Sequence, residues 1–265
     1  MGHTDHERRR LSVQAQALNP LTRDFFERAG IGPGMRVLDL GCGVGEVSLI
    51  AARMVGPGGH VTGLDIDPSA LEIARGRAVA EGLHHAVFEE ANVADYLPEA
   101  PFDAVTGRLI LIHTADPAAI VRRAAGFLRP DGIIAMQDYD LSRFIPSCPP
   151  KPLRDRTLQS IVEFFTRATP QADVGMRLYQ LLLDAGLAEP QCRGECAIGG
   201  GPASIMHEWF AETVRTLLPR MEAMGLAAAD EIDIETLADR LRDEAASVGG
   251  CVVGPMLIGA FARKT

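Results

Sequence analysis

Residues 36–46 read RVLDLGCGVGE, an apolar run with one aspartate that leads directly into three alternating glycines. Such a run predicts a buried strand followed by a tight turn, because glycine adopts backbone conformations that are closed to other residues. Val47, Ala51 and Met54 then repeat at helical spacing. A strand, a tight turn and a helix in this order form the repeating unit of parallel α/β sheets, so this stretch constrains the fold of the whole chain.

The same alternation of short apolar runs and amphipathic helical patterns continues to about residue 138. Chains of this kind form right-handed crossovers, which predict an α/β fold with a doubly wound, mostly parallel sheet. With two later strands the pattern predicts seven strands, at 36–40, 60–65, 86–90, 103–107, 132–138, near 190–198 and in the final run CVVGPMLIGAFARK.

Helical patterns flank this core on both sides. Leu11, Ala15 and Leu18 predict a helix before the first strand, and Asn19-Pro20 is typical of a cap and the first residue of a second helix. After residue 138 the rhythm changes. We predict a single domain over residues 1–265, with a cofactor-binding half at 30–138 and helical insertions at 139–170 and 200–248 that cover the substrate site.

The composition excludes several classes of protein. The 265 residues include 47% hydrophobic and 23% charged residues, enough for a globular core, and the formal net charge is −9. This balance disfavours nucleic acid or an anionic membrane as a partner. No apolar run approaches the roughly 18 residues of a membrane span, and the N-terminus lacks an apolar signal core, so a cytoplasmic protein is expected. The scattered cysteines and histidines predict no metal site.

The glycine loop indicates the chemistry of a ligand. Dinucleotide-binding loops read G-x-G-x-x-G and hold a diphosphate, whereas here the sixth position is Glu46. We expect that carboxylate, together with Asp39 before the loop, to disfavour phosphates. A cationic adenosine compound without phosphates fits better, and S-adenosylmethionine is such a compound, with Gly41 and Gly43 letting the backbone lie against it.

The second predicted strand ends in GLDID, where an acid can bind the two hydroxyls of a ribose. Asp65 is the candidate for that contact, and the apolar Ile66 behind it can pack on adenine. Asp67, followed by Pro68, is expected to cap the next helix.

The stretches VLDLGCGVGE, GLDID, NVADYLPEAPFDAV and LRPDG together resemble the class I S-adenosylmethionine-dependent methyltransferases, in particular the group related to the menaquinone and ubiquinone biosynthesis enzymes. The resemblance covers about residues 10–138. It implies a seven-stranded class I methyltransferase fold and a set of cofactor-binding residues, which are Gln14, Asp39, Gly41, Gly43, Asp65, Ile66, Asn92, Val93 and Arg108. Asn92 stands where the family often has aspartate, which implies a weaker contact with the adenine amino group.

Three further residues are candidates for catalysis because they follow predicted strands at the ligand-binding edge. His113 is a candidate general base, since its ordinary pKa lies near neutrality, and the alternatives are a helix-start residue or a cofactor contact. Asp138 is a candidate for orienting a substrate hydroxyl or amine, with a turn residue as an equal alternative. Tyr139 could stack on a substrate ring.

The sequence therefore predicts an enzyme that transfers a methyl group from S-adenosylmethionine to an O, N or C atom of a small molecule, such as a quinone, a phenol or another secondary metabolite. Two alternatives keep the cofactor: a non-methylating reaction such as a cyclisation, and a non-catalytic binding protein. A dinucleotide-dependent dehydrogenase would need glycine at position 46. A homodimer is compatible with the sequence, which leaves the acceptor and the oligomeric state open.

Overall fold

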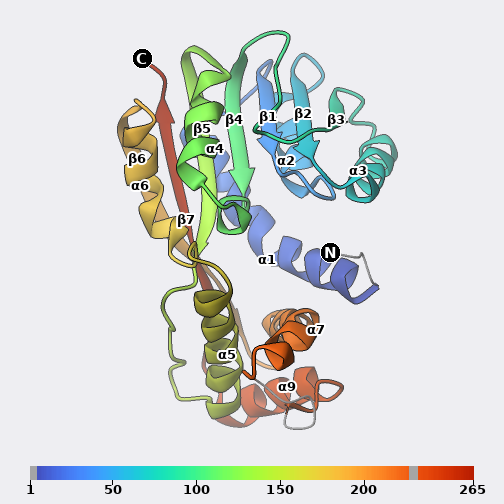
Figure 1. Ribbon diagram of the computed structural model, residues 1–265. Coiled ribbons are helices and arrows are strands. Elements are labelled where there is room, and N and C mark those ends of the chain that lie inside the picture. The colour runs from blue at the N-terminus through green and yellow to red at the C-terminus, as the bar shows by residue number, and fades with distance from the viewer. Residues whose placement is uncertain (1–4, 227–231) are drawn as a thin grey trace. The chain divides into compact units, whose positions relative to one another are not determined.

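The computed structural model describes residues 5–226 and 232–265, with side chains from Arg9 onward. Helices and strands alternate as the sequence predicts (Figure 1). In chain order the elements are α1 (Asp5–Ala29), β1 (Arg36–Leu40), α2 (Glu46–Val55), β2 (His60–Asp65), α3 (Pro68–Ala80), β3 (Ala86–Glu90), β4 (Phe102–Arg108), the short 3₁₀ helix η1 (Leu111–His113), α4 (Pro117–Gly126), β5 (Leu128–Asp140), α5 (Pro152–Ala168), α6 (Val174–Asp184), β6 (Ala188–Gly200), α7 (Met206–Ala223), α9 (Leu237–Val248) and β7 (Cys251–Arg263).

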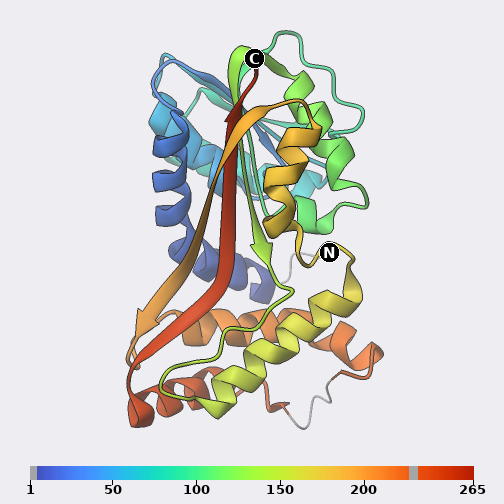
Figure 2. The ribbon, with the colours of Figure 1, turned by 90° about the vertical axis from the view of Figure 1, so that its left-hand side faces the viewer.

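The strands form one seven-stranded sheet in the order β3-β2-β1-β4-β5-β7-β6, which confirms the predicted α/β class. The five strands β1 to β5 pair in parallel, with Val37 of β1 opposite Val61 of β2 and Ala104 of β4. β7 runs in the opposite direction to β5 (Figures 1 and 2). The winding direction reverses at β1 and β4, so ligands are expected beyond the carboxyl ends of these two strands.

The core lies between the sheet and its helices, as the apolar patterns require. β1 is buried from Val37 to Leu40, and β2 from Val61 to Leu64, because both lie inside a sheet that helices cover on two faces. Figure 2 shows the sheet edge-on, with the C-terminal part of α1 (residues 19–29) on one side and α4 and α6 on the other. Phe25 of α1 packs edge-to-face on Phe261 of β7, with ring centroids 5.8 Å apart.

The chain divides into two compact units. The first unit contains residues 1–18, 140–172 and 195–256, and the second contains residues 19–139, 173–194 and 257–265. The predicted cofactor-binding half falls in the second unit, whereas the predicted helical insertions fall almost entirely in the first. That the whole chain acts as one domain stays a prediction.

The structure corrects two of the predicted element boundaries, at Asn19-Pro20 and in β5. Asn19 and Pro20 do not begin a new helix, because α1 continues through both residues. Proline has a helical φ, but it removes one backbone hydrogen bond and crowds the carbonyl four residues earlier; α1 nevertheless continues past it. The Asn19 side chain instead forms hydrogen bonds outside α1, as described below. β5 is also longer than the predicted 132–138, since it begins at Leu128 and continues to Asp140.

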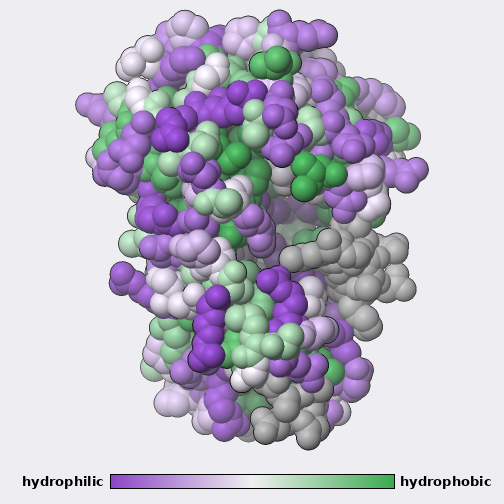
Figure 3. Space-filling view, in the orientation of Figure 1, coloured by the Kyte–Doolittle hydropathy of each residue, from purple (hydrophilic) through white to green (hydrophobic). Residues whose placement is uncertain are grey.

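The face of the molecule in Figure 3 is largely hydrophilic, with hydrophobic residues scattered over it. Within the residues that the structure describes, no helix has the length and apolar character needed to cross a bilayer.

Candidate active site

The glycine loop after β1 leaves open space beside its backbone. Gly41, Gly43 and Gly45 all have positive φ, at 62°, 51° and 84°. A Cβ added to Gly41 would lie 2.8 Å from Cδ1 of Ile110, so packing requires glycine there. A Cβ added to Gly43 would meet nothing within 4 Å. Gly43 therefore borders a space into which the backbone can present itself to a ligand.

Asp65 joins the two sequence motifs into one site. Its Oδ2 accepts a hydrogen bond of 2.7 Å from the backbone N–H of Gly43, and its Oδ1 accepts one of 3.0 Å from Asp67. Ile66, the next residue, is 70% exposed, which leaves its apolar surface free to pack against a flat ligand. Asp67 caps α3 by accepting from the backbone N–H of Ser69 at 2.9 Å, as expected.

Asp39 is buried beneath the loop, with 1% exposure. Its Oδ2 accepts from the Ser48 hydroxyl at 2.6 Å, and Thr106 donates to its Oδ1 at 3.4 Å. Burial raises the pKa of Asp39 to about 7, although the bond from Ser48 opposes that rise. In the structure Asp39 ties β1 to α2, and its contact with the methionine part of a cofactor stays a prediction.

Glu46 does not face the loop as a free carboxylate, contrary to the electrostatic reasoning from the sequence. Its Oε1 lies 2.7 Å from Nη1 of Arg77, and its Oε2 accepts from Nδ2 of Asn19 at 2.8 Å. The same Arg77 donates to the carbonyl of Val44 at 2.9 Å. Glu46 thus fastens the start of α2 to α1 and α3, a role that single-residue reasoning about charge could not identify.

Arg108 ends β4 at the same edge of the sheet and is half-buried. Its Nη1 donates to Oδ1 of Asn19 at 3.1 Å and to the Thr22 hydroxyl at 2.8 Å. Burial lowers the pKa of its guanidinium, while Tyr139, Glu46 and Asp39 act in the opposite direction. Gln137 of β5 is the register partner of Arg108 and is buried, and its Oε1 has no hydrogen-bond partner in the described part of the chain.

The predicted adenine contacts lie after β3. The Asn92 side chain accepts a hydrogen bond of 2.9 Å from the backbone N–H of Ala94, which closes a local turn. Val93 is 7% exposed, and its carbonyl accepts from Nε of Arg123 at 2.6 Å. Both residues stand at the carboxyl edge of the sheet, and their contact with adenine stays a prediction.

The three catalytic candidates share one neighbourhood, because Asp138 holds the turn that carries His113. Oδ2 of the fully buried Asp138 accepts from the backbone N–H groups of Leu111 and Ile112 at 2.8 and 3.2 Å, and its Oδ1 accepts from Tyr139 at 3.0 Å. Burial raises the pKa of Asp138 to about 7. His113 is exposed at the end of η1, and Tyr139 is buried. This geometry favours a structural role for Asp138, the alternative left open by the sequence.

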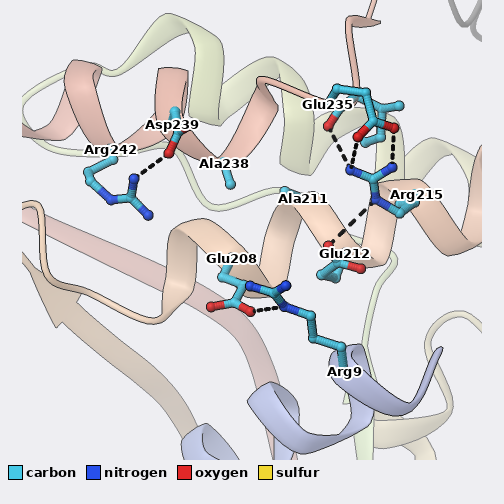
Figure 4. A pocket seen from close by; sticks show the side chains of 10 residues that line it. Arg9, Glu208, Ala211, Glu212, Arg215, Glu235, Ala238, Asp239 and Arg242 are labelled. Carbon is cyan, nitrogen blue, oxygen red and sulfur yellow. Dashed lines mark hydrogen bonds and ion pairs between the residues drawn. The ribbon is translucent and has the colours of Figure 1, made fainter. Parts of the chain in front are cut away.

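Gln14 belongs to the first unit, where its Oε1 accepts from Nη1 of Arg10 at 2.9 Å. Its predicted role in closing the cofactor site stays a prediction. The same unit contains a pocket of about 220 Å³ lined mainly by charged side chains, and none of its lining residues is a predicted site residue (Figure 4). Its charges pair with one another: Arg9 with Glu208, Arg215 with Glu235, and Arg242 with Asp239.

Among the residues described, no cluster of three or more His, Cys, Asp or Glu side chains could hold a metal ion.

Two residues of this edge, Asn19 and Gln137, were missed by sequence reasoning. Asn19 carries the signature of a helix cap, which masks any other role, and Gln137 lies inside an apolar strand pattern. A polar residue next to Asp138 in a buried strand is the one signal that points to Gln137.

A mostly parallel sheet in this order, with a glycine loop after β1 and an acid at the end of β2, is typical of nucleoside-binding α/β proteins of the doubly wound class. A family model described as a methyltransferase domain matches residues 31–168, more than half of the chain. The chain therefore belongs to the methyltransferase-domain family, as the resemblance in its motifs implied.

Individual relatives agree with this family. A ubiquinone biosynthesis O-methyltransferase of Xylella fastidiosa (strain M23) is 40% identical over 118 residues, which are 44% of this chain and 46% of that protein. The chain thus spans about half the length of the curated relatives it matches.

Two solved structures have a similar fold. The [4+2]-cyclase SpnF has a TM-score of 0.57 at 21% identity, over 94% of this chain and 82% of that chain. Phospholethanolamine N-methyltransferase 2 of Haemonchus contortus, solved with phosphomonomethylethanolamine and S-adenosylhomocysteine, has a TM-score of 0.58 at 19% identity, over 92% of this chain and 52% of that chain. At these identities the likeness establishes the fold alone.

Proposed function

We propose that this protein is an S-adenosylmethionine-dependent methyltransferase that transfers a methyl group to an O, N or C atom of a small molecule. The observation that carries the proposal is the hydrogen bond of 2.7 Å from Gly43 to Asp65, beside the open space over Gly43. It joins a loop that can approach a ligand closely to a carboxylate that can accept hydrogen bonds. Membership of the methyltransferase-domain family supports the same cofactor.

In this proposal each part of the cofactor meets a different strand end. Asp65 accepts from the ribose hydroxyls, and the exposed Ile66 packs on adenine, whose edge lies toward Asn92 and Val93. Arg108 binds the carboxylate of the methionine part, and Asp39 stabilises the loop from below. The fit is chemically reasonable because two backbone N–H groups fix the orientation of the Asp65 carboxylate, and the open space over Gly43 lets the backbone approach a ligand closely.

The bound cofactor supplies a methyl group already activated by its sulfonium. The protein therefore has to align the acceptor, exclude water and, for a hydroxyl or amine acceptor, remove a proton. We assign the removal of that proton to His113, which is exposed at the end of η1. Asp138 keeps this turn in place, and Tyr139 lies next to it in the chain as a candidate contact to the acceptor. That the helical insertions at 139–170 and 200–248 cover the substrate site stays a prediction.

A phenolic hydroxyl is the acceptor to test first, because the Xylella relative is by name an O-methyltransferase of ubiquinone biosynthesis. The likeness to the SpnF cyclase is one of fold and does not favour a cyclisation here.

The test combines binding with turnover. Calorimetry should show that S-adenosylhomocysteine binds the wild-type protein and that Asp65→Ala weakens this binding about tenfold or more, the loss of roughly two hydrogen bonds. Asp67→Ala is the matched control, since it removes a neighbouring carboxylate that caps α3 and should leave affinity within about threefold. Incubation with S-adenosylmethionine and a panel of phenols, amines and quinones should yield a product about 14 Da heavier, detected by mass spectrometry.

Three results would count against the proposal. Tight binding of NADH with indifference to S-adenosylhomocysteine would reject the cofactor. Equal affinity of the Asp65→Ala variant and wild type would reject the ribose contact. Cofactor binding without any S-adenosylhomocysteine formed across a broad extract of small molecules would favour the non-catalytic alternative.

A further inference from the structure

A continuous polar chain connects α3, α2, α1 and β4 in the second unit. Arg77 contacts Glu46 at 2.7 Å, Glu46 accepts from Nδ2 of Asn19 at 2.8 Å, and Oδ1 of Asn19 accepts from Arg108 at 3.1 Å. A primary amide can donate to a carboxylate with one end and accept from a guanidinium with the other. The amide of Asn19 is therefore oriented by both charged neighbours, and it stands between a carboxylate and a guanidinium that would otherwise attract each other.

The guanidinium of Arg108 is only partly used by the protein. The described residues provide hydrogen-bond partners for its Nη1 alone, through Asn19 and Thr22. Nε and Nη2 remain for another acceptor, and a planar guanidinium binds a carboxylate best through two adjacent N–H groups.

A second polar group at the same strand end also lacks a partner. Gln137 is 2% exposed, and no residue within the described ranges donates to its Oε1. Gln137 is directly opposite Arg108 in the β4–β5 pairing, so the two side chains emerge on the same face of the sheet. A buried amide oxygen without a donor is costly, which makes a ligand donor at this point favourable.

We propose that Asn19 is a positioning residue that keeps Arg108 free of Glu46 and oriented toward the α-carboxylate of the cofactor. An amino-acid end supplies both missing partners at once, because its carboxylate accepts from Arg108 and its ammonium donates to Oε1 of Gln137. This inference rests on the proposed function. It adds a residue on α1 that never touches the cofactor and yet governs the affinity for one end of it.

Two nucleosides separate this role from a merely structural one. S-adenosylhomocysteine carries the amino-acid end, whereas 5′-methylthioadenosine has the same adenosine and thioether but lacks that end. Asn19→Asp keeps the size of the side chain and adds a charge that repels Glu46 and pairs with Arg108 directly. Calorimetry should therefore show a loss of about tenfold or more in affinity for S-adenosylhomocysteine and less than about twofold for 5′-methylthioadenosine.

A control variant and a second test variant accompany Asn19→Asp. Gln16→Glu adds the same charge at an exposed position of α1 and should leave both affinities within about twofold. Thr22→Val removes the other partner of Arg108 without a change of size and should show the same selective loss. It provides the test if Asn19→Asp does not fold.

Each outcome bears on the inference. Equal losses for the two nucleosides, or no loss for either, in the folded variants would overturn it while leaving the proposed function intact. A wild-type protein that takes up neither nucleoside would overturn the proposed function and this inference together.

Discussion

Glycine is required at positions 41 and 43 of the same loop for different physical reasons. Both have positive φ, but only Gly41 is packed so closely that a Cβ would collide with Ile110. Gly43 faces open space, where the ligand is proposed to lie. The requirement for glycine at 43 therefore comes from the backbone conformation and from the ligand.

This difference predicts the behaviour of Gly43→Ala. The variant should fold with a loss of about 1 kcal/mol in the free energy of unfolding, the cost of a left-handed conformation for alanine. It should also lose affinity for S-adenosylhomocysteine by about tenfold or more, because the new methyl group occupies the ligand's space. Denaturant unfolding and calorimetry measure the two effects separately.

Gly34→Ala is the matched control. Gly34 has a φ of 80° and nothing within 4 Å of an added Cβ, but it precedes β1, at the opposite edge of the sheet. It should show the same loss of stability with unchanged affinity. Equal affinities for the two alanine variants would contradict the placement of the ligand over Gly43.

At the scale of elements, the end of β5 organises the turn after β4. Asp138 accepts three backbone N–H groups, and these hydrogen bonds, with no cation among the described residues that act on its pKa, are what favour its ionised form against burial. A carboxyl in this position connects strand to turn whether or not it contacts an acceptor.

The raised pKa of Asp138 predicts a pH dependence of stability. The pKa is about 7 in the folded protein and about 3.9 in an unfolded chain, so the folded state holds the proton more tightly. Its contribution to stability is present below about pH 4 and is lost as the pH rises to about 7. Relative to Asp138→Asn, which cannot ionise, the wild type should lose up to about 4 kcal/mol over this window.

Urea unfolding at several pH values measures this difference, and Asp39 does not disturb it because its titration is common to both proteins. Asp116→Asn, an exchange at the exposed cap of α4, provides the reference for a surface carboxyl. A stability difference between wild type and Asp138→Asn that stays constant from about pH 4 to 8 would contradict the assignment.

At the scale of the whole molecule, the first unit is organised around a buried arginine. Arg154 is 1% exposed, donates to the carbonyls of Ile145 and Val253, and lies over the ring of Phe210 at 5.6 Å. These contacts connect α5 to the segment before it, to β7 and to α7.

Arg154→Met should therefore destabilise the first unit selectively, by about 3 kcal/mol, because it leaves buried carbonyls without donors. Hydrogen exchange should accelerate in residues 140–172 and 195–256 and change little in residues 36–65. Arg156→Ala, at an exposed position of the same helix, should leave exchange unchanged. Uniform acceleration through both units would show that they unfold as one.

The sequence by itself determined the α/β class, the mostly parallel sheet and the two motifs at the ligand-binding edge. These features can be predicted because apolar periodicity, glycine conformation and helix caps depend only on residues a few positions apart, as at Gly41, Asp65 and Asp67. The course of α1 through Pro20, the neutralised Glu46, the turn held by Asp138 and the pairing of Asn19 with Arg108 were decided only by the tertiary structure. Each of these depends on partners that are distant in the sequence. The role of a charged or polar side chain is therefore set only when the fold brings those partners into contact with it.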